Sequence, residues 1–188
     1  MGQIRIIAGQ WRSRRISVAQ RPGLRPTSDR ARETLFNWLN AWLPWNWEEV
    51  DVLDAYAGSG ALGLEAASRG AASVTLVESD PAVALGIEQS LRLLKAPPSV
   101  RLLRGRFLDQ RQLPGSPFSL VFLDPPFGLN LVRPSLHAVV TQTRPGALVY
   151  VESEACWPLD LPETEQTDWE VLRAAKTGRS FQTLLQRR

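Results

Sequence analysis

The sequence predicts an α/β fold, with a mostly parallel central sheet, a C-terminal antiparallel hairpin and an N-terminal β-hairpin extension. From residue 50 onward, short apolar runs alternate with helical patterns, as in a chain of strand–helix–strand units. These runs are apolar on both faces, which is typical of strands in a parallel sheet covered by helices. Glycines and prolines mark several boundaries between the runs and the helices, where connections are expected.

The N-terminal part precedes this alternation. QIRIIAGQWRSRRISV alternates apolar and polar residues and is interrupted near residues 8–10, which predicts a hairpin. After the loop RPGLRP, residues 27–43 are expected to form a helix with Thr27 or Ser28 as its N-cap. One face of this helix should pack on the core, because apolar residues recur at helical spacing: Ala31, Leu35, Trp38, Leu39 and Trp42. PWNWEE then reads as a linker.

Five strands are predicted after the linker, at VDVLDAYAG, SVTLVES, VRLLRG, FSLVFLD and ALVYVES. Helices are expected at 61–70, ended by Gly70, at 81–95, opened by Pro81, and at 131–142. The last twenty residues predict two strands that turn at 176–178. We divide the chain into a basic hairpin extension, residues 1–26, and one compact domain, residues 27–188.

The composition excludes several classes of protein. Hydrophobic residues make up 44% and charged residues 22% of the 188 residues, as in an ordinary globular domain rather than a disordered chain. The single cysteine excludes an internal disulfide and favours a reducing compartment, and the single histidine offers no histidine metal site. No apolar run approaches the ~18 residues of a membrane span, and no signal-peptide pattern is present. We expect a soluble, cytoplasmic, monomeric protein that binds no metal.

The charge is unevenly distributed. The net charge is only +3, but residues 1–32 carry many arginines and a single acid, Asp29. Such a concentration indicates a polyanionic partner, with a solvated basic face as the alternative. Arg12 and Arg14 are expected on one face of the second hairpin strand and Arg15 on the other.

A glycine loop follows the first central strand. GSGALG, residues 58–63, lies between a strand and a helix, and Glu78 ends the next strand, 24 residues beyond Asp54. The glycines let a ligand approach the backbone, and the acid suits a ribose diol, although the glycines could also serve only a tight turn. The pattern occurs in nicotinamide, flavin and S-adenosylmethionine sites. Asp54 would repel a pyrophosphate but suits an ammonium and a sulfonium, so the loop favours S-adenosylmethionine.

A second candidate site is VFLDPPFG, residues 121–128. Each proline restricts the residue before it to extended geometry and donates no hydrogen bond, so Asp124 and the Pro125 carbonyl present a cluster of acceptors. Phe127 offers a flat surface for a base. Acceptors of this kind would hold the exocyclic amino group of an extruded base and stabilise the positive charge that builds as a methyl group arrives. The alternative is a strand end with two incidental prolines.

Taken together, these motifs resemble a known family. DAYAGSGALGLEA, LVESD and DPPF are similar to the motifs of amino-group methyltransferases that use S-adenosylmethionine. GQIRIIAGQWRSRRI, GLRPTSDRARETLFNWL and YVESE resemble more narrowly the bacterial 16S rRNA guanine-N2 methyltransferases of the RsmD family, over residues 2 to about 154. The resemblance implies a Rossmann-like methyltransferase sheet, S-adenosylmethionine as cofactor, and 16S rRNA in a small ribosomal subunit or its assembly intermediate as partner.

The resemblance also implies roles for individual residues. The cofactor contacts would be Asp54, Ala57, Gly58, Ser59, Gly60, Glu78 and Ser79, together with Arg106 and Phe107. The target base would be held by Asp124, Pro125, Pro126 and Phe127, and the RNA by Arg5, Arg12, Arg14, Arg15 and Arg25. One departure is RGRF, where many such enzymes place an acid or a small polar residue to meet the cofactor's adenine. Asp109 lies nearby but out of register, so this contact is assigned to backbone groups near Arg106 and Phe107.

Three other functions remain open at this point. The chain could be an adenine-N6 methyltransferase acting on RNA or DNA, since DPPF is shared with those enzymes. It could be a non-catalytic RNA-binding protein with the same fold, or a nicotinamide oxidoreductase. Of the seven tryptophans, only Trp11 in the basic hairpin is a candidate for contact with RNA.

Overall fold

The centre of the molecule is a seven-stranded sheet of order β5-β4-β3-β6-β7-β9-β8. This is a computed structural model, and it describes residues 2–18, 29–43, 46–158 and 161–188 of the chain. The strands are β3 (Asp51–Asp54), β4 (Ser73–Glu78), β5 (Val100–Arg104), β6 (Phe118–Leu123), β7 (Thr143–Ser153), β8 (Trp169–Thr177) and β9 (Ser180–Arg187).

The sheet has the predicted mixture of directions. Strands β5, β4, β3, β6 and β7 are parallel to one another, whereas β9 runs antiparallel to β7 and pairs with β8 as an antiparallel hairpin. The chain proceeds from β3 outward to β4 and β5, then returns to add β6 and β7 on the other side of β3. The switch point therefore lies between β3 and β6, where open sheets of this type bind their ligands. The predicted α/β fold class is confirmed.

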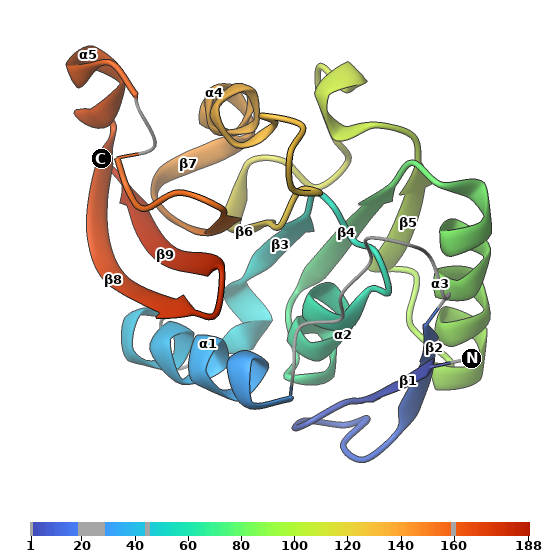
Figure 1. Ribbon diagram of the computed structural model, residues 1–188. Helices are drawn as coiled ribbons and strands as arrows, with labels where there is room; N and C mark the ends of the chain where they lie inside the picture. The colour runs from blue at the N-terminus through green and yellow to red at the C-terminus, as the bar shows by residue number, and fades with distance from the viewer. Residues whose placement is uncertain (1, 19–28, 44–45, 159–160) are drawn as a thin grey trace.

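Helices cover both faces of the sheet (Figure 1). One face carries α1 (Asp29–Trp42), α2 (Ala61–Ser68) and α3 (Pro81–Leu94), and the opposite face carries α4 (Val132–Gln142). A single turn of helix, α5 (Glu163–Gln166), precedes β8. Among the described residues, no helix is both long enough and apolar enough to span a membrane.

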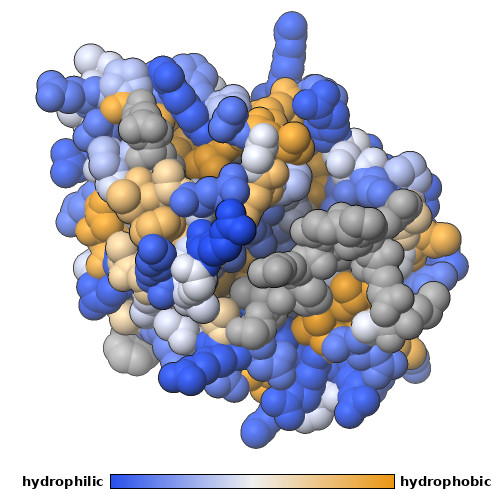
Figure 2. Space-filling view, viewed as in Figure 1, coloured by the Kyte–Doolittle hydropathy of each residue, from blue (hydrophilic) through white to orange (hydrophobic). Residues whose placement is uncertain are grey.

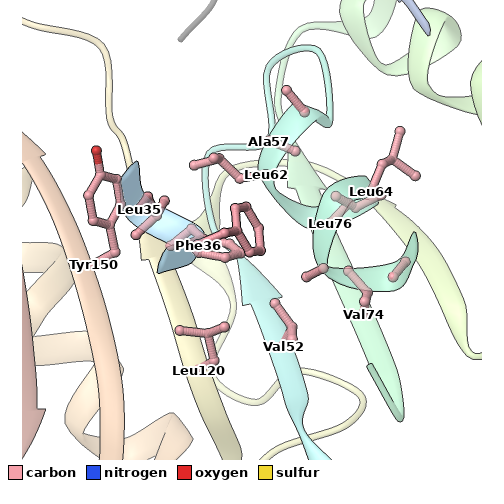
Figure 3. Close-up of a cluster of buried hydrophobic side chains, with 14 of the residues drawn as sticks. Leu35, Phe36, Val52, Ala57, Leu62, Leu64, Val74, Leu76, Leu120 and Tyr150 are labelled. Carbon is pink, nitrogen blue, oxygen red and sulfur yellow. The ribbon is translucent and has the colours of Figure 1, made fainter. Parts of the chain in front are cut away.

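Alternate side chains of each strand enter two separate apolar cores, as the two-residue period of a strand requires. Phe122 of β6 and Tyr150 of β7 belong to the core under α1 and α2, with their ring centroids 6.4 Å apart. Figure 3 shows Tyr150 beside Leu35 of α1 in this cluster. The neighbouring residues Leu123 and Val151 enter the core under α4.

Helix α1 buries the predicted face only in part. Leu35 and Leu39 are buried as expected, together with Phe36, but Trp42 is 41% exposed. The expectation that Trp42 packs into the core is therefore wrong, because Trp42 is the last residue of the helix and its ring meets the Arg173 guanidinium of β8 at 5.7 Å. The proposed N-caps, residues 27 and 28, lie outside the described residues. The predicted linker contains a short 3₁₀ helix, Trp47–Glu49.

The N-terminal hairpin is present as a separate two-stranded sheet, in which β1 (Gly2–Arg5) pairs antiparallel with β2 (Arg15–Val18). Hydrophilic residues cover this lower border of the molecule (Figure 2). The turn of the hairpin packs against the C-terminal end of α2. There Gly9 has a φ of 78°, and a Cβ on it would lie 1.7 Å from the Ser68 carbonyl oxygen, so only glycine fits.

Trp11 is not available for contact with RNA. Its backbone N–H donates to Ser68 Oγ at 2.9 Å, and its side chain is only 6% exposed within the core that includes α2. The interpretation of Trp11 as an RNA contact is wrong, because the close approach at Gly9 turns this part of the hairpin onto α2. The proposed domain boundary at residue 26 lies in a segment outside the described residues.

Candidate active site

The glycine loop connects β3 to α2 by a tight turn. Gly58 and Gly60 have φ values of 54° and 78°, which favour glycine. The Gly60 N–H donates to the Ala57 carbonyl at 2.6 Å, and the Ala57 N–H donates to the Val77 carbonyl at 2.9 Å. The third glycine, Gly63, lets α2 approach β4, because a Cβ on it would lie 2.4 Å from the Leu76 side chain.

Two carboxylates hold this loop from its strand side. Glu78 accepts the Gly58 N–H at 2.9 Å and the Asp80 N–H at 2.7 Å, one with each carboxylate oxygen. Asp54 accepts the Gly63 N–H at 2.9 Å. Sequence reasoning treated both acids only as ligand contacts and missed that they also fix the loop. Their spacing to the glycines was visible, but which amide each would accept depends on how β3 and β4 pair.

Asp54 is almost fully buried, at 2% exposure. Burial and, to a smaller extent, the Glu78 charge raise the pKa of its carboxyl group to about 7, although the hydrogen bond from the Gly63 N–H lowers the pKa. Below about pH 7, the protonated form is therefore favoured in the folded protein when no ligand cation is bound.

This shift makes stability depend on pH. The carboxyl group loses its proton near its usual pKa of 3.8 in the unfolded chain and near 7 in the folded one, so stability falls as pH rises between these values. Asp54→Asn removes the ionisation. We expect its free energy of unfolding, relative to wild type, to rise by about 2–3 kcal/mol between pH 5 and pH 8. Urea unfolding at the two pH values measures this difference, and a difference independent of pH would contradict the account.

The DPPF segment follows β6 at the same edge of the sheet. Asp124 is partly buried and Pro125 is buried, whereas Pro126 and Phe127 are exposed, Phe127 at 44%. The Gly128 N–H donates to the Glu154 carboxylate at 2.7 Å, which ties the loop to the segment after β7. Phe127 is thus an exposed aromatic ring on a loop that is anchored on both sides.

Asp124 lies in an acidic environment. Burial raises the pKa of its carboxyl group well above the usual range, and the charges of Glu152 and Asp54 raise it further. The glycine loop and the DPPF segment are therefore close enough to interact electrostatically, across the switch point between β3 and β6. Burial and the charges of Glu152 and Asp124 also raise the pKa of Tyr150. Neither Glu152 nor Tyr150 was among the predicted site residues.

The remaining predicted cofactor contacts lie along the same edge. Ala57 is buried and Ser59 partly buried in the glycine loop, and Ser79 is exposed just after β4. Arg106 and Phe107 follow β5, whose last residue pairs with Glu78. The Arg106 side chain is exposed, but Phe107 is buried, with its ring edge-on to Tyr56 at 6.1 Å. Within the described ranges, no three acidic, histidine or cysteine residues gather as a metal site would require.

The basic hairpin residues are arranged differently from the prediction. Strand β2 begins at Arg15, and Arg15 pairs in register with Arg5, so these two share a face. Arg12 lies in the preceding turn, closed by its N–H donating to the Gly9 carbonyl at 3.1 Å, and Arg14 is the last residue before β2. The expected shared face of Arg12 and Arg14 is wrong, because neither residue is in the strand.

The side chains of all four hairpin arginines that the structure describes are exposed: Arg5, Arg12, Arg14 and Arg15. Arg5 lies 3.3 Å from an Asp29 oxygen, and Arg15 donates to Gln3 at 3.3 Å. One surface pocket is lined by Gln3, Arg5, Arg15 and Asp29. Arg25 lies outside the described residues. The hairpin lies at the lower edge of Figure 1, whereas the arrowheads of β3 and β4 point upward, so hairpin and strand ends lie toward opposite edges of the sheet.

This sheet order, with a glycine loop after β3 and an aspartate after β6, is the Rossmann-like arrangement of S-adenosylmethionine-dependent methyltransferases. A family model described as "Conserved hypothetical protein 95" matches residues 4–186. Ribosomal RNA small subunit methyltransferase D of Escherichia coli strain K12 is 43% identical over 188 residues, covering 99% of this chain and 91% of the relative. The protein of the same name from Haemophilus influenzae is 41% identical over 182 residues, covering 94% and 90%.

Solved structures agree with these sequence matches. The structure of the Escherichia coli protein yhhF superposes with a TM-score of 0.82 at 40% identity, covering 99% of this chain and 98% of that chain. The chain belongs to the family of ribosomal RNA small subunit methyltransferase D, and the predicted family resemblance is confirmed.

Proposed function

We propose that this protein transfers a methyl group from S-adenosylmethionine to the exocyclic N2 of a guanine in 16S rRNA, within a small ribosomal subunit or its assembly intermediate. The observation that carries the proposal is the position of Asp124. It lies at the switch point, where its carboxyl group interacts electrostatically with Asp54, next to the glycine loop. The family relationship supports the methylation of rRNA.

The residues at the glycine loop fit S-adenosylmethionine better than a dinucleotide. Two carboxylates, Asp54 and Glu78, hold the loop, and no cation among the described residues forms an ion pair with either. A pyrophosphate would meet repulsion there, whereas an ammonium and a sulfonium would be stabilised. Glu78 is only partly buried and keeps acceptor capacity for ribose hydroxyls. S-adenosylmethionine supplies the electrophilic methyl group.

Glu78→Ala should weaken binding of S-adenosylmethionine about 10- to 100-fold, the effect of losing a hydrogen bond to a charged acceptor. The loss has two sources, because the variant also releases the Gly58 N–H from the loop. Titration calorimetry on the folded variant measures the change. Glu88→Ala is the matched control, because it removes a partly buried carboxylate of α3 that pairs with Arg104. Equal affinities in Glu78→Ala and the control would remove Glu78 from the site.

Asp124 and the Pro125 carbonyl act on the target base. They accept hydrogen bonds from the N2 amino group, which orients the nitrogen lone pair toward the methyl carbon while Phe127 stacks on the ring. The new N–C bond forms as the bond from sulfur to the methyl carbon breaks, with its electron pair staying on sulfur. N2 then carries a positive charge and releases one proton to Asp124. A carboxylate is the group that both stabilises this charge and accepts the proton.

The exposed arginines of the hairpin bind the RNA backbone. Guanidinium groups contact phosphate oxygens without reading sequence, so they position the RNA while the DPPF pocket selects the base. The hairpin contacts the C-terminal end of α2, and the glycine loop precedes its N-terminal end. Eight helical residues span about 12 Å, so the bound RNA crosses this face of the protein from the hairpin to the strand ends.

Arg12→Ala combined with Arg14→Ala should weaken RNA binding and reduce its salt dependence by about one unit of slope per lost phosphate contact. Cofactor affinity should stay unchanged, because neither side chain takes part in the hydrogen bonds that join the hairpin to α2. Affinity for 16S rRNA across a salt series measures the slope. The matched control removes two exposed arginines elsewhere, Arg111→Ala with Arg133→Ala. Equal slopes of RNA affinity against salt concentration for the wild type and the hairpin variant would show that these arginines only increase solubility.

Labelling experiments test the proposed reaction. The protein is incubated with methyl-labelled S-adenosylmethionine and either naked 16S rRNA or undermethylated small subunits, and the RNA is digested to nucleosides. Label in N2-methylguanosine supports the proposal. Label in N6-methyladenosine would instead favour an adenine-N6 methyltransferase. No transfer to either substrate would favour a non-catalytic RNA-binding protein.

A further inference from the structure

Glu152 is the nearest acidic neighbour of Asp124 along the sheet. Leu123 of β6 pairs in parallel register with Val151 of β7, so the residues that follow, Asp124 just after β6 and Glu152 within β7, lie side by side. Both point to the face that carries α1, because Phe122 and Tyr150, two residues earlier, pack together on that face. The two carboxyl groups thus project from the same edge toward the same side.

The hydrogen bonds of Glu152 orient its carboxylate without neutralising it. One oxygen accepts the Tyr150 hydroxyl at 3.2 Å and the other accepts the Ser180 hydroxyl of β9 at 2.6 Å. Burial and the nearby carboxylates keep the pKa of Tyr150 high, so its hydroxyl stays protonated and remains a donor. No lysine, arginine or histidine in the described parts of the chain forms an ion pair with Glu152. A partly buried anion without a cation favours a ligand that brings hydrogen-bond donors.

Guanine is the base that presents the matching donors. Its Watson–Crick edge carries the N1–H next to the N2 amino group, so two adjacent carboxylates can each accept a hydrogen from it. Adenine and cytosine instead place a ring nitrogen lone pair beside their amino groups, and this lone pair would face the carboxylate of Glu152. Such a mismatch rejects the wrong base more strongly than a lost apolar contact does.

We propose that Glu152 selects guanine by accepting its N1–H, while Asp124 and the Pro125 carbonyl accept the hydrogens of N2. This assignment rests on the proposed function and names the residue that determines its specificity. Tyr150 and Ser180 are positioning residues that hold the Glu152 carboxylate. Glu154, two residues further along, anchors Gly128 and thereby the loop that carries Phe127.

A base analogue probes this contact. 2-Aminopurine keeps the N2 amino group but has a lone pair in place of the N1 hydrogen, and it also lacks the O6 carbonyl, so the change of preference in Glu152→Gln is what reports on N1. The guanine methylated in the labelling experiment is located, and 16S rRNA is prepared with guanine or 2-aminopurine at that position. We expect the wild type to prefer guanine by about 100-fold or more in kcat/KM. Glu152→Gln should lower this preference by about 10-fold or more, because its amide nitrogen can donate to the N1 lone pair of 2-aminopurine.

Two further variants separate recognition from structural support. Glu152→Asp keeps a carboxylate, so its rate should fall while the preference for guanine remains. Ser180→Ala removes one orienting hydrogen bond from β9 but keeps the carboxylate, so it should lower the preference only slightly, by about threefold at most. If Glu152 served only to join β7 to β9, Ser180→Ala would change the preference as much as Glu152→Gln does.

The outcomes distinguish the assignment from the proposed function. Absence of N2-methylguanosine with wild-type protein would overturn the proposed function itself. Methylation of guanine with an equal preference in wild type and Glu152→Gln would overturn only the role of Glu152. Equal rates of the wild type on guanine and 2-aminopurine would overturn that role without any variant, even if Glu152→Gln failed to fold.

Discussion

Asp124→Ala should retain its fold and its affinity for S-adenosylmethionine but lose most methyl transfer. The acceptor acts on charge that develops only in the transition state, so its removal lowers the rate more than the binding of either substrate. By analogy with the removal of one oxyanion-hole donor, we expect a loss of about 100- to 1000-fold in the single-turnover rate. Asp124→Asn should be similarly impaired, because its amide offers no group that can take a proton from N2.

The raised pKa of Asp124 adds a pH dependence to this prediction. Only the ionised carboxyl group can accept both the hydrogen bond and the proton, so the rate should increase as pH rises through the pKa of Asp124. That pKa lies well above the usual range because of burial and the neighbouring Glu152 and Asp54. The residual rate of Asp124→Asn should not show this increase with pH. A variant rate near that of the wild type at a pH above the pKa of Asp124 would contradict the role of Asp124.

Glu65→Ala should be the most destabilising of these substitutions, by about 3–5 kcal/mol in the free energy of unfolding. Glu65 of α2 is fully buried and accepts the backbone N–H groups of Ile7 at 2.7 Å and Ala8 at 3.0 Å. It also lies 3.6 Å from the guanidinium of Arg32, which is itself fully buried, and 3.0 Å from Arg69. Without Glu65, two backbone donors lose their acceptor, and among the described residues the buried guanidinium of Arg32 keeps only the partly exposed Asp29 as a charged partner.

Urea unfolding compares this variant with a matched control. Glu165→Ala breaks an ion pair between Glu165 and Arg133 at 2.9 Å, but both side chains are partly exposed, so its effect on the free energy of unfolding should be much smaller than that of Glu65→Ala. Glu65→Gln keeps one acceptor oxygen and should fall between the two. If Glu65→Ala cost no more than Glu165→Ala, the buried network would not be what joins the hairpin to α2.

The sequence was sufficient to predict the elements of the sheet because local patterns determine them. Two-sided apolar runs located the central strands, and Pro81 stands at the first position of α3 as expected. The hairpin pattern at the N-terminus also matched β1 and β2. These features need only neighbouring residues, and periodicity reports on them directly.

The residues that sequence reasoning missed depend on contacts between distant segments. Glu65 appears as a lone acid in the apolar stretch ALGLEAAS, and its partners lie 57 and 58 residues away in the hairpin. Trp11 lies among arginines in the sequence, which suggested an exposed aromatic residue. In the structure the turn at Gly9 brings its backbone N–H within hydrogen-bond distance of Ser68 Oγ. Glu152 becomes a neighbour of Asp124 only because β7 pairs with β6 in that register, which strand periodicity does not specify.

The most direct test of the central claim is identification of the labelled nucleoside made by the wild type and by Asp124→Asn from methyl-labelled S-adenosylmethionine and undermethylated small subunits. The account predicts N2-methylguanosine as the wild-type product and a loss of about 100-fold or more in Asp124→Asn at unchanged cofactor affinity. Label in any other nucleoside, or equal label from the two proteins, would contradict it.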